Sequence, residues 1–115
     1  MSVEERLAAR IAGAVSLADL QAVAYETAVA KGWHEGENRD RDFPGWCMMA
    51  VTEIAEAVQA HRKGAGTAVV GEELADAVIR LLDTAAAMGI DLEDAIRRKM
   101  LCNLGRERRH GGLPY

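Results

Sequence analysis

The feature that most constrains this chain is the stretch from about Trp46 to Lys63, which is apolar on nearly every side of a helix. Apolar residues recur there at helical spacing and Gly64 follows the last of them, so the stretch predicts one long helix. A helix that is apolar all round is a buried helix. We therefore expect it to sit centrally in the fold, with neighbours on more than one face.

The rest of the chain has the same helical periodicity and no pattern typical of strands. Aromatic residues are 4% of the sequence, and β-branched runs of strand length are absent. Capping residues and glycines divide the pattern into further helices. These cover roughly residues 3–14, 16–32, 72–88 and 91–104.

With 115 residues, the chain has the length of a single domain, 1–115. We therefore predict an all-α fold, a bundle of about four to five helices in which the two long helices pack antiparallel. The glycine-containing segment 64–71 is the expected flexible connector between them. Residues 32–45 form a long charged loop of the kind that carries function, and an irregular basic tail begins at about Gly105.

Charge is distributed unevenly along the chain. Residues 97–115 contain six Lys or Arg against one Glu, whereas residues 1–96 contain eight against seventeen acids. An acidic body argues against binding of a nucleic-acid polymer, while the basic tail is suited to a small polyphosphate. The acidic N-terminus is unlike a signal peptide, no apolar run has the length of a membrane span, and the two cysteines form no disulfide or zinc pattern. We expect a cytoplasmic protein.

The strongest candidates for chemistry are four acids that form two i, i+3 pairs, each on one face of a predicted helix. The pairs are Glu53 with Glu56 and Glu73 with Asp76. They lie among Ala, Ile, Leu and Val, and Lys and Arg are absent from residues 42–61 and 64–79. Burial of such charges without a counter-charge costs several kcal/mol. If the two long helices pack antiparallel, the four carboxylates converge, and their cheapest partner is a hard divalent cation, Mg²⁺ first and Mn²⁺ as a substitute.

Two other interpretations of these acids stay open. They could face solvent on amphipathic helices, with Arg62 or Arg80 across the turn as counter-charge, because a run of charge is usually a solvated face. A di-iron bundle would need two Glu-x-x-His units in a core, and the chain has one, from Glu107 to His110.

The acidic pairs and their surroundings resemble the MazG-like, all-α nucleoside triphosphate pyrophosphohydrolases. The family pattern is ExxE, a spacer and ExxD, and this chain has EIAE at 53–56, sixteen residues, and ELAD at 73–76. The similarity continues through a Lys-Met-x-x-Asn stretch at Lys99 to Asn103, followed by spaced arginines and His-Gly. Upstream, KGWH precedes a loop and the helix MMAVTEIAEAV, so the resemblance covers roughly residues 20–112.

The resemblance implies Mg²⁺-dependent hydrolysis of a nucleoside or deoxynucleoside triphosphate to the monophosphate and pyrophosphate, as nucleotide-pool housekeeping. The metal ligands that it implies are Glu53, Glu56, Glu73 and Asp76, of which Glu53 and Glu56 are also the catalytic candidates. The substrate-binding residues that it implies are Lys99, Asn103, Arg106 and Arg109 towards the nucleotide and its triphosphate, and Trp33 and His34 towards the base. Many members of the family have a glutamate just before the first motif residue, where this chain has Thr52, so the identity of the general base stays open.

Family members of this size assemble as dimers or tetramers, so we expect a homo-dimer or homo-tetramer with sites near helix interfaces, in agreement with a helix that is apolar on several sides. The main alternative is a non-catalytic helical module that uses the same bundle to bind a partner. A second alternative is a phosphohydrolase that releases inorganic phosphate.

Overall fold

The computed structural model describes residues 1–38 and 42–109, and these form five α-helices and no strand. The helices are α1 (Val3–Gly13), α2 (Leu17–Ala30), α3 (Phe43–Arg62), α4 (Thr67–Ala87) and α5 (Leu92–Leu104), and a short 3₁₀ turn, η1 (Gly36–Asn38), lies between α2 and α3. The all-α prediction is confirmed. Within the described ranges, no helix is long and apolar enough to cross a membrane.

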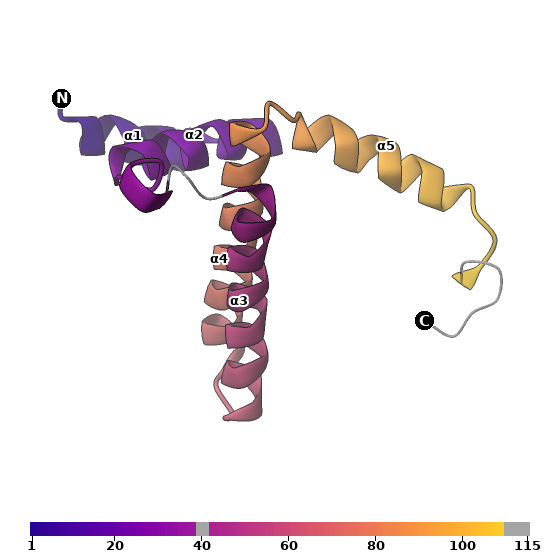
Figure 1. Ribbon diagram of the computed structural model, residues 1–115. Helices are drawn as coiled ribbons and strands as arrows, with labels where there is room; N and C mark the ends of the chain where they lie inside the picture. Colours follow the sequence, from indigo (N-terminus) through magenta and orange to yellow (C-terminus); the bar gives the residue numbers. More distant parts are fainter. Residues whose placement is uncertain (39–41, 110–115) are drawn as a thin grey trace.

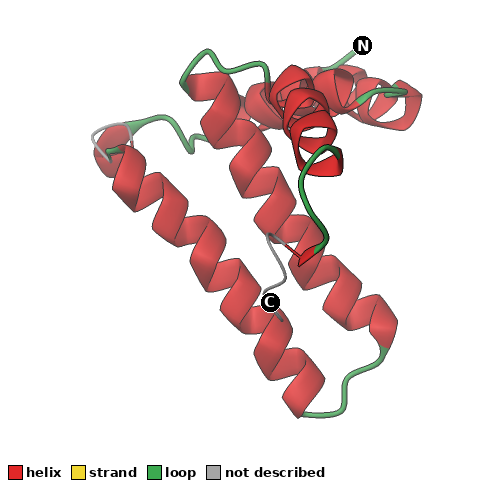
Figure 2. Cartoon of the chain, turned by 90° about the vertical axis from the view of Figure 1, so that its right-hand side faces the viewer, coloured by secondary structure: helices red, strands yellow, loops and turns green. Residues whose placement is uncertain are grey.

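The long helices α3 and α4 lie side by side as an antiparallel hairpin (Figures 1 and 2). Helices α1 and α2 lie across one end of this hairpin, and α5 leaves the same end and points away from it (Figure 1). The central helix is α4, which contacts α2, α3 and α5. The expectation that the helix around residues 46–63 is central is wrong for the single chain, because α4 is the one described helix that α3 contacts.

Side-chain caps set the starts of most helices. The side chains of Ser2, Ser16 and Asp91 each accept a hydrogen bond from the backbone N–H three residues on, at 3.0 Å. Such caps satisfy backbone donors that the first helical turn leaves without a partner. The predicted starts of α1, α2 and α5, and the predicted end of α5 at Leu104, are confirmed.

The two long helices both begin earlier than the sequence predicts. Helix α3 begins at Phe43 because Asp42 caps it, accepting a hydrogen bond from the Gly45 N–H at 3.1 Å, and Pro44 is tolerated in the first turn. Helix α4 begins at Thr67, so most of the expected connector 64–71 is helical. Part of the predicted 32–45 loop (residues 39–41) and His110 of the Glu-x-x-His unit lie outside the described residues.

The hydrophobic core is small and consists largely of alanine. Ala50 and Ala57 on α3 and Ala77 on α4 are buried, so small side chains form the seam of the hairpin, while Leu82 and Val23 fill the region where α2 meets α4. The radius of gyration is 16.6 Å, compared with roughly 13 Å for a compact domain of this length. The chain is therefore elongated, and much apolar surface remains exposed.

One buried polar side chain joins the turn between α4 and α5 to α2. The Gln21 amide donates to the Ile90 carbonyl at 2.7 Å and accepts from the Leu92 N–H at 3.3 Å. Glu93 in turn accepts from the Leu17 N–H at 3.0 Å. These contacts fix the root of α5, whereas the helix itself has no buried residue.

Candidate metal and anion site

Carboxylates from the two long helices meet about halfway along the hairpin. Glu53 on α3 and Glu73 and Asp76 on α4 each offer an oxygen, and these oxygens lie within 4.8 Å of one another. Glu53 and Glu73 are half-buried, whereas Asp76 is exposed. The sequence-based prediction that acids from the two antiparallel helices converge therefore holds for three of the four residues.

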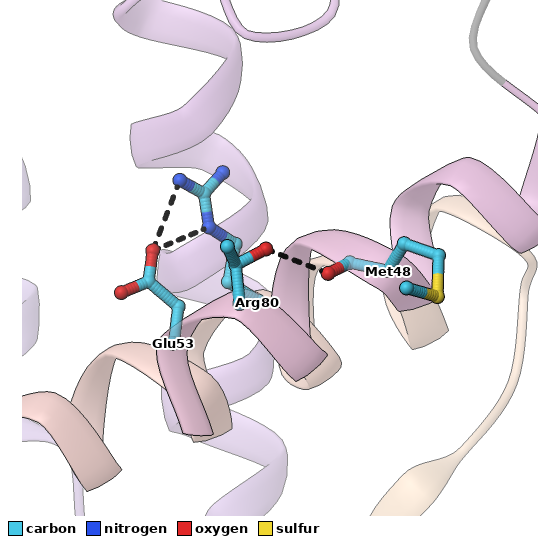
Figure 3. A network of polar contacts seen from close by, with 4 residues as sticks. Met48, Glu53 and Arg80 are labelled. Carbon is cyan, nitrogen blue, oxygen red and sulfur yellow. Dashed lines mark hydrogen bonds and ion pairs between the residues drawn. The ribbon is translucent and has the colours of Figure 1, made fainter. Parts of the chain in front are cut away.

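Glu56 is the fourth predicted ligand, and it lies outside this group and is exposed. It follows Glu53 by one helical turn on α3, so it lies next to the cluster along the helix axis. The neighbouring Thr52 donates its hydroxyl proton to the Met48 carbonyl at 2.7 Å and is thereby satisfied within α3 (Figure 3). Thr52 offers a hydroxyl and no carboxylate, so it does not add a further acid to the cluster.

Among the described residues, Arg80 is the basic side chain that forms an ion pair with a carboxylate of the cluster. Its Nη2 and Nε atoms lie 3.3 and 3.4 Å from the same oxygen, Oε1, of Glu53 (Figure 3). The exposed fractions of the two side chains are 24% for Arg80 and 13% for Glu53. The interpretation in which the acids face solvent expects an arginine as counter-charge across a helical turn. Glu53 has such a counter-charge in Arg80, but the two residues lie on different helices and their ion pair is half-buried.

Trp33 lies beside this pair. The Arg80 guanidinium carbon is 4.9 Å from the centroid of the Trp33 ring, within the range of a cation–π interaction. The backbone N–H of Trp33 donates to the Ala28 carbonyl at 2.9 Å, and Gly32 before it has φ +81°, so the end of α2 fixes the backbone from which the ring projects. The indole is 42% exposed and lines a groove.

The groove has a volume of about 620 Å³ and runs between α2 and α4. Its wall is mostly apolar, and its charged members include Lys31, Glu53, Asp76 and Arg80. Thr27 also lines it, and the Thr27 hydroxyl is buried without a hydrogen-bond partner among the described residues. Such an unpaired buried group is unusual in proteins, and a polar group bound in the groove would satisfy it.

His34, the second predicted base-binding residue, interacts with other protein groups. Its Nε2 lies 2.8 Å from Oδ1 of the buried Asp83, and its ring lies 5.1 Å from the rings of both Tyr25 and Trp46. This contact ties the loop after α2 to α4. The sequence offered one signal for Asp83: it follows Asp76 by seven residues and so shares its face of the helix.

The predicted C-terminal substrate residues lie apart from the carboxylates in the chain. Lys99 and Asn103 are on α5, Arg106 and Arg109 follow it, and all four are exposed. Helix α5 makes no contact with α3 and points away from the hairpin (Figure 1). The described chain therefore does not bring these residues to Glu53, Glu73 and Asp76.

The three carboxylates suit a hard divalent cation. Such ions prefer oxygen ligands at about 2.0 to 2.5 Å, so that opposite ligands around one ion are about 4 to 5 Å apart. The oxygens of the cluster lie within 4.8 Å of one another, so one ion could reach all three. The partial exposure of the group also leaves room for waters or substrate oxygens in the coordination shell. Glu53, Glu73 and Asp76 are therefore the residues that could hold the metal.

No protein-family model, curated protein sequence or solved structure matches this chain.

Proposed function

We propose that the protein is a divalent-cation-dependent nucleoside triphosphate pyrophosphohydrolase that converts (d)NTP and water to (d)NMP and pyrophosphate. The observation that carries the proposal is the meeting of Glu53, Glu73 and Asp76 from two helices beside a groove of about 620 Å³. The MazG-like ExxE and ExxD pattern adds the reaction class. Both features are expected of a site that binds a metal and a polyphosphate together.

The residues have distinct tasks in this proposal. Glu53, Glu73 and Asp76 would hold Mg²⁺, and such an ion would supply charge neutralisation for phosphate oxygens and a water of lowered pKa. Glu53 and Glu56 remain the candidates for the general base, and the exposed carboxylate of Glu56 is accessible to a water proton. The groove, with the Trp33 ring and the unpaired Thr27 hydroxyl on its wall, would take the nucleoside.

The proposal includes assembly as a homo-dimer or homo-tetramer. Helix α5 makes no contact with α3. The C-terminal substrate residues are therefore better placed to reach the carboxylate cluster of a neighbouring subunit than the cluster of their own chain; they are Lys99, Asn103, Arg106 and Arg109. Cationic side chains stabilise the charge of a triphosphate. A second copy would also cover the apolar residues that the single chain leaves exposed on α3 and α5.

The cluster is tested by binding and product analysis on matched variants. We expect Mg²⁺ or Mn²⁺ to raise the melting temperature of the wild-type protein, and mixed dNTPs to release pyrophosphate. Glu73→Gln should abolish the rise in melting temperature. It should also slow pyrophosphate release at least about 100-fold, because the developing phosphate charge loses its stabilisation. Glu72→Gln is the control, since Glu72 is exposed, adjacent on α4 and outside the cluster.

Each alternative predicts a different result. A non-catalytic interaction module would show neither cation stabilisation nor product, and Glu73→Gln would behave as wild type. A phosphohydrolase would release inorganic phosphate and leave a nucleoside diphosphate. Either outcome would contradict the proposal.

A further inference from the structure

Four of the five charged residues of α4 form a single stripe, and Glu72 is the fifth. Glu73, Asp76, Arg80 and Asp83 follow one another at helical spacing, so they lie on one face of the helix. Three of them are acids, and Arg80 is the one base. Among the described residues, Arg80 is also the basic side chain that forms an ion pair with a carboxylate of the cluster.

The contact between Arg80 and Glu53 is long and one-sided. A strong arginine–carboxylate pair joins two nitrogens to two oxygens at about 2.7 to 2.9 Å. Here Nη2 and Nε share one oxygen, Oε1 of Glu53, at 3.3 and 3.4 Å. Within the described part of the chain, no hydrogen bond reaches Oε2 of Glu53. The guanidinium therefore balances the charge of Glu53 without occupying the carboxylate fully.

Arg80 also has a second fixed partner that does not belong to the cluster. Its guanidinium lies 4.9 Å from the centroid of the Trp33 ring, and the backbone of Trp33 is hydrogen-bonded to the end of α2. A guanidinium can stay against an aromatic face while its N–H groups bind an anion. Arg80, Trp33 and Glu53 all line the same groove, so the guanidinium could leave Glu53 and still face that space.

Charge balance explains why such a movement would accompany cation binding. Three ionised carboxylates carry three negative charges, and Arg80 reduces the sum to two. A divalent cation that binds Glu53 adds two positive charges next to the guanidinium. At a few ångströms the two like charges repel each other, and the effect is strong because the pair is half-buried.

We propose that Arg80 is a displaceable counter-ion. It balances Glu53 when no metal is bound, competes with a divalent cation for that carboxylate, and after displacement stays against Trp33 as an anion-binding group in the groove. This inference rests on the proposed function, since it assigns a role to Arg80 at the same site. By linkage, cation and anion then strengthen each other's binding.

Cation affinity measures the competition directly. Mn²⁺ binding, followed by electron paramagnetic resonance at fixed ionic strength, is compared for wild type, Arg80→Gln and Arg80→Lys. Removal of the positive charge in Arg80→Gln should lower the Kd for Mn²⁺ by up to about fivefold, the upper end of the range for one partly exposed charge pair. Arg80→Lys keeps the charge and should stay within about twofold of wild type. Arg62→Gln is the control for net charge, because Arg62 is exposed at the end of α3.

The outcomes separate this inference from the proposed function. If wild type binds Mn²⁺ and Arg80→Gln binds it equally or more weakly, the counter-ion role is overturned and the metal site stands. An equal gain in Arg62→Gln also overturns it, because the effect would then come from net charge. If neither wild type nor Arg80→Gln binds Mn²⁺, the proposed function itself fails.

A second measurement needs no stable Arg80 variant. In Trp46→Phe, Trp33 is the one remaining tryptophan, and its emission reports on the guanidinium beside its ring. We expect Mg²⁺ to change this emission with the same midpoint as the rise in melting temperature. Thermal stabilisation without a change in emission would show that Arg80 does not move, and would overturn the inference.

Discussion

Asp83 and His34 connect the loop after α2 to α4, next to the residues of the proposed site. The whole residue Asp83 is 7% exposed. Its side chain taken alone is 10% exposed, and the His34 side chain is 18% exposed. The imidazole also contacts the rings of Tyr25 and Trp46. Because Trp33 directly precedes His34, this contact contributes to holding the Trp33 ring beside Arg80.

Asp83→Ala should therefore destabilise the protein measurably. The substitution leaves the half-buried imidazole without its 2.8 Å partner, and loss of a buried hydrogen-bond partner costs about 1 to 3 kcal/mol. Urea denaturation followed by circular dichroism measures the change. Asp94→Ala is the matched control, because its ion pair with Arg98 is largely exposed and should contribute less than about 0.5 kcal/mol. Equal losses in the two variants would contradict the role given to the Asp83–His34 contact.

At the scale of single residues, the sequence predicts the convergence of the acids better than it predicts the residues with which they interact. The i, i+3 spacing and the antiparallel packing of two helices were sufficient to predict that Glu53, Glu73 and Asp76 converge. The exposure of Glu56 depends on how far α3 is rotated about its axis, which spacing does not determine. The contacts Arg80–Glu53 and His34–Asp83 join residues 27 and 49 positions apart, so they follow from tertiary packing. The sequence names Arg80 as a possible counter-charge for the acids, but the local pattern does not say that Glu53 is its partner.

Among the helices, α4 differs most from its predicted extent. Thr67, Val69 and Val70 are β-branched, and glycines lie at positions 66 and 71, so local propensity disfavours a helix there. The structure continues the helix to Thr67 because Gly66 provides the N-cap, its carbonyl accepting from the Val69 and Val70 N–H groups. Packing along α3 compensates for the poor propensity. Helix α5 was predicted accurately because Asp91 is a strong local cap.

Substitution of a glycine within α4 tests this extension. Gly71 lies in the helix, and an added Cβ would meet no atom within 4 Å, so Gly71→Ala should stabilise the protein by about 0.5 to 1 kcal/mol. Gly64 has φ +77°, and Gly64→Ala should destabilise it by about 1 kcal/mol because the left-handed region disfavours a side chain. Both changes are measured as shifts of the urea midpoint. If residues 64–71 were a flexible connector, neither substitution would matter much.

At the scale of the whole molecule, the elongated shape leaves apolar side chains without cover. Val51, Ile54 and Val58 are exposed on α3, and Met100, Leu101 and Leu104 are exposed on α5, with Leu104 82% exposed. Exposed apolar patches of this kind usually mark an interface. The proposed homo-dimer or homo-tetramer would cover these side chains.

Size-exclusion chromatography with light scattering should give a mass of about two or four times the 12.4 kDa of the chain. Leu101→Asp/Leu104→Asp should lower this mass towards that of one chain, because charges in an apolar interface are costly to bury. Ala95→Asp is the control, since Ala95 is exposed on the opposite side of α5. A monomeric wild type, or an unchanged mass in the double variant, would contradict this use of α5.

The hydrogen bonds of Gln21 hold α5 at one end only. Hydrogen bonds of Gln21 and Glu93 hold the helix at its first turn, while no buried side chain anchors the remainder. A helix of this length spans about 20 Å, so a tilt of about 10° at the hinge would carry its far end through roughly 3 Å. A small displacement of the Gln21 amide would thus move the arginines that follow Leu104 by a larger distance, so the contacts at the start of α5 set the position of the charges beyond its end.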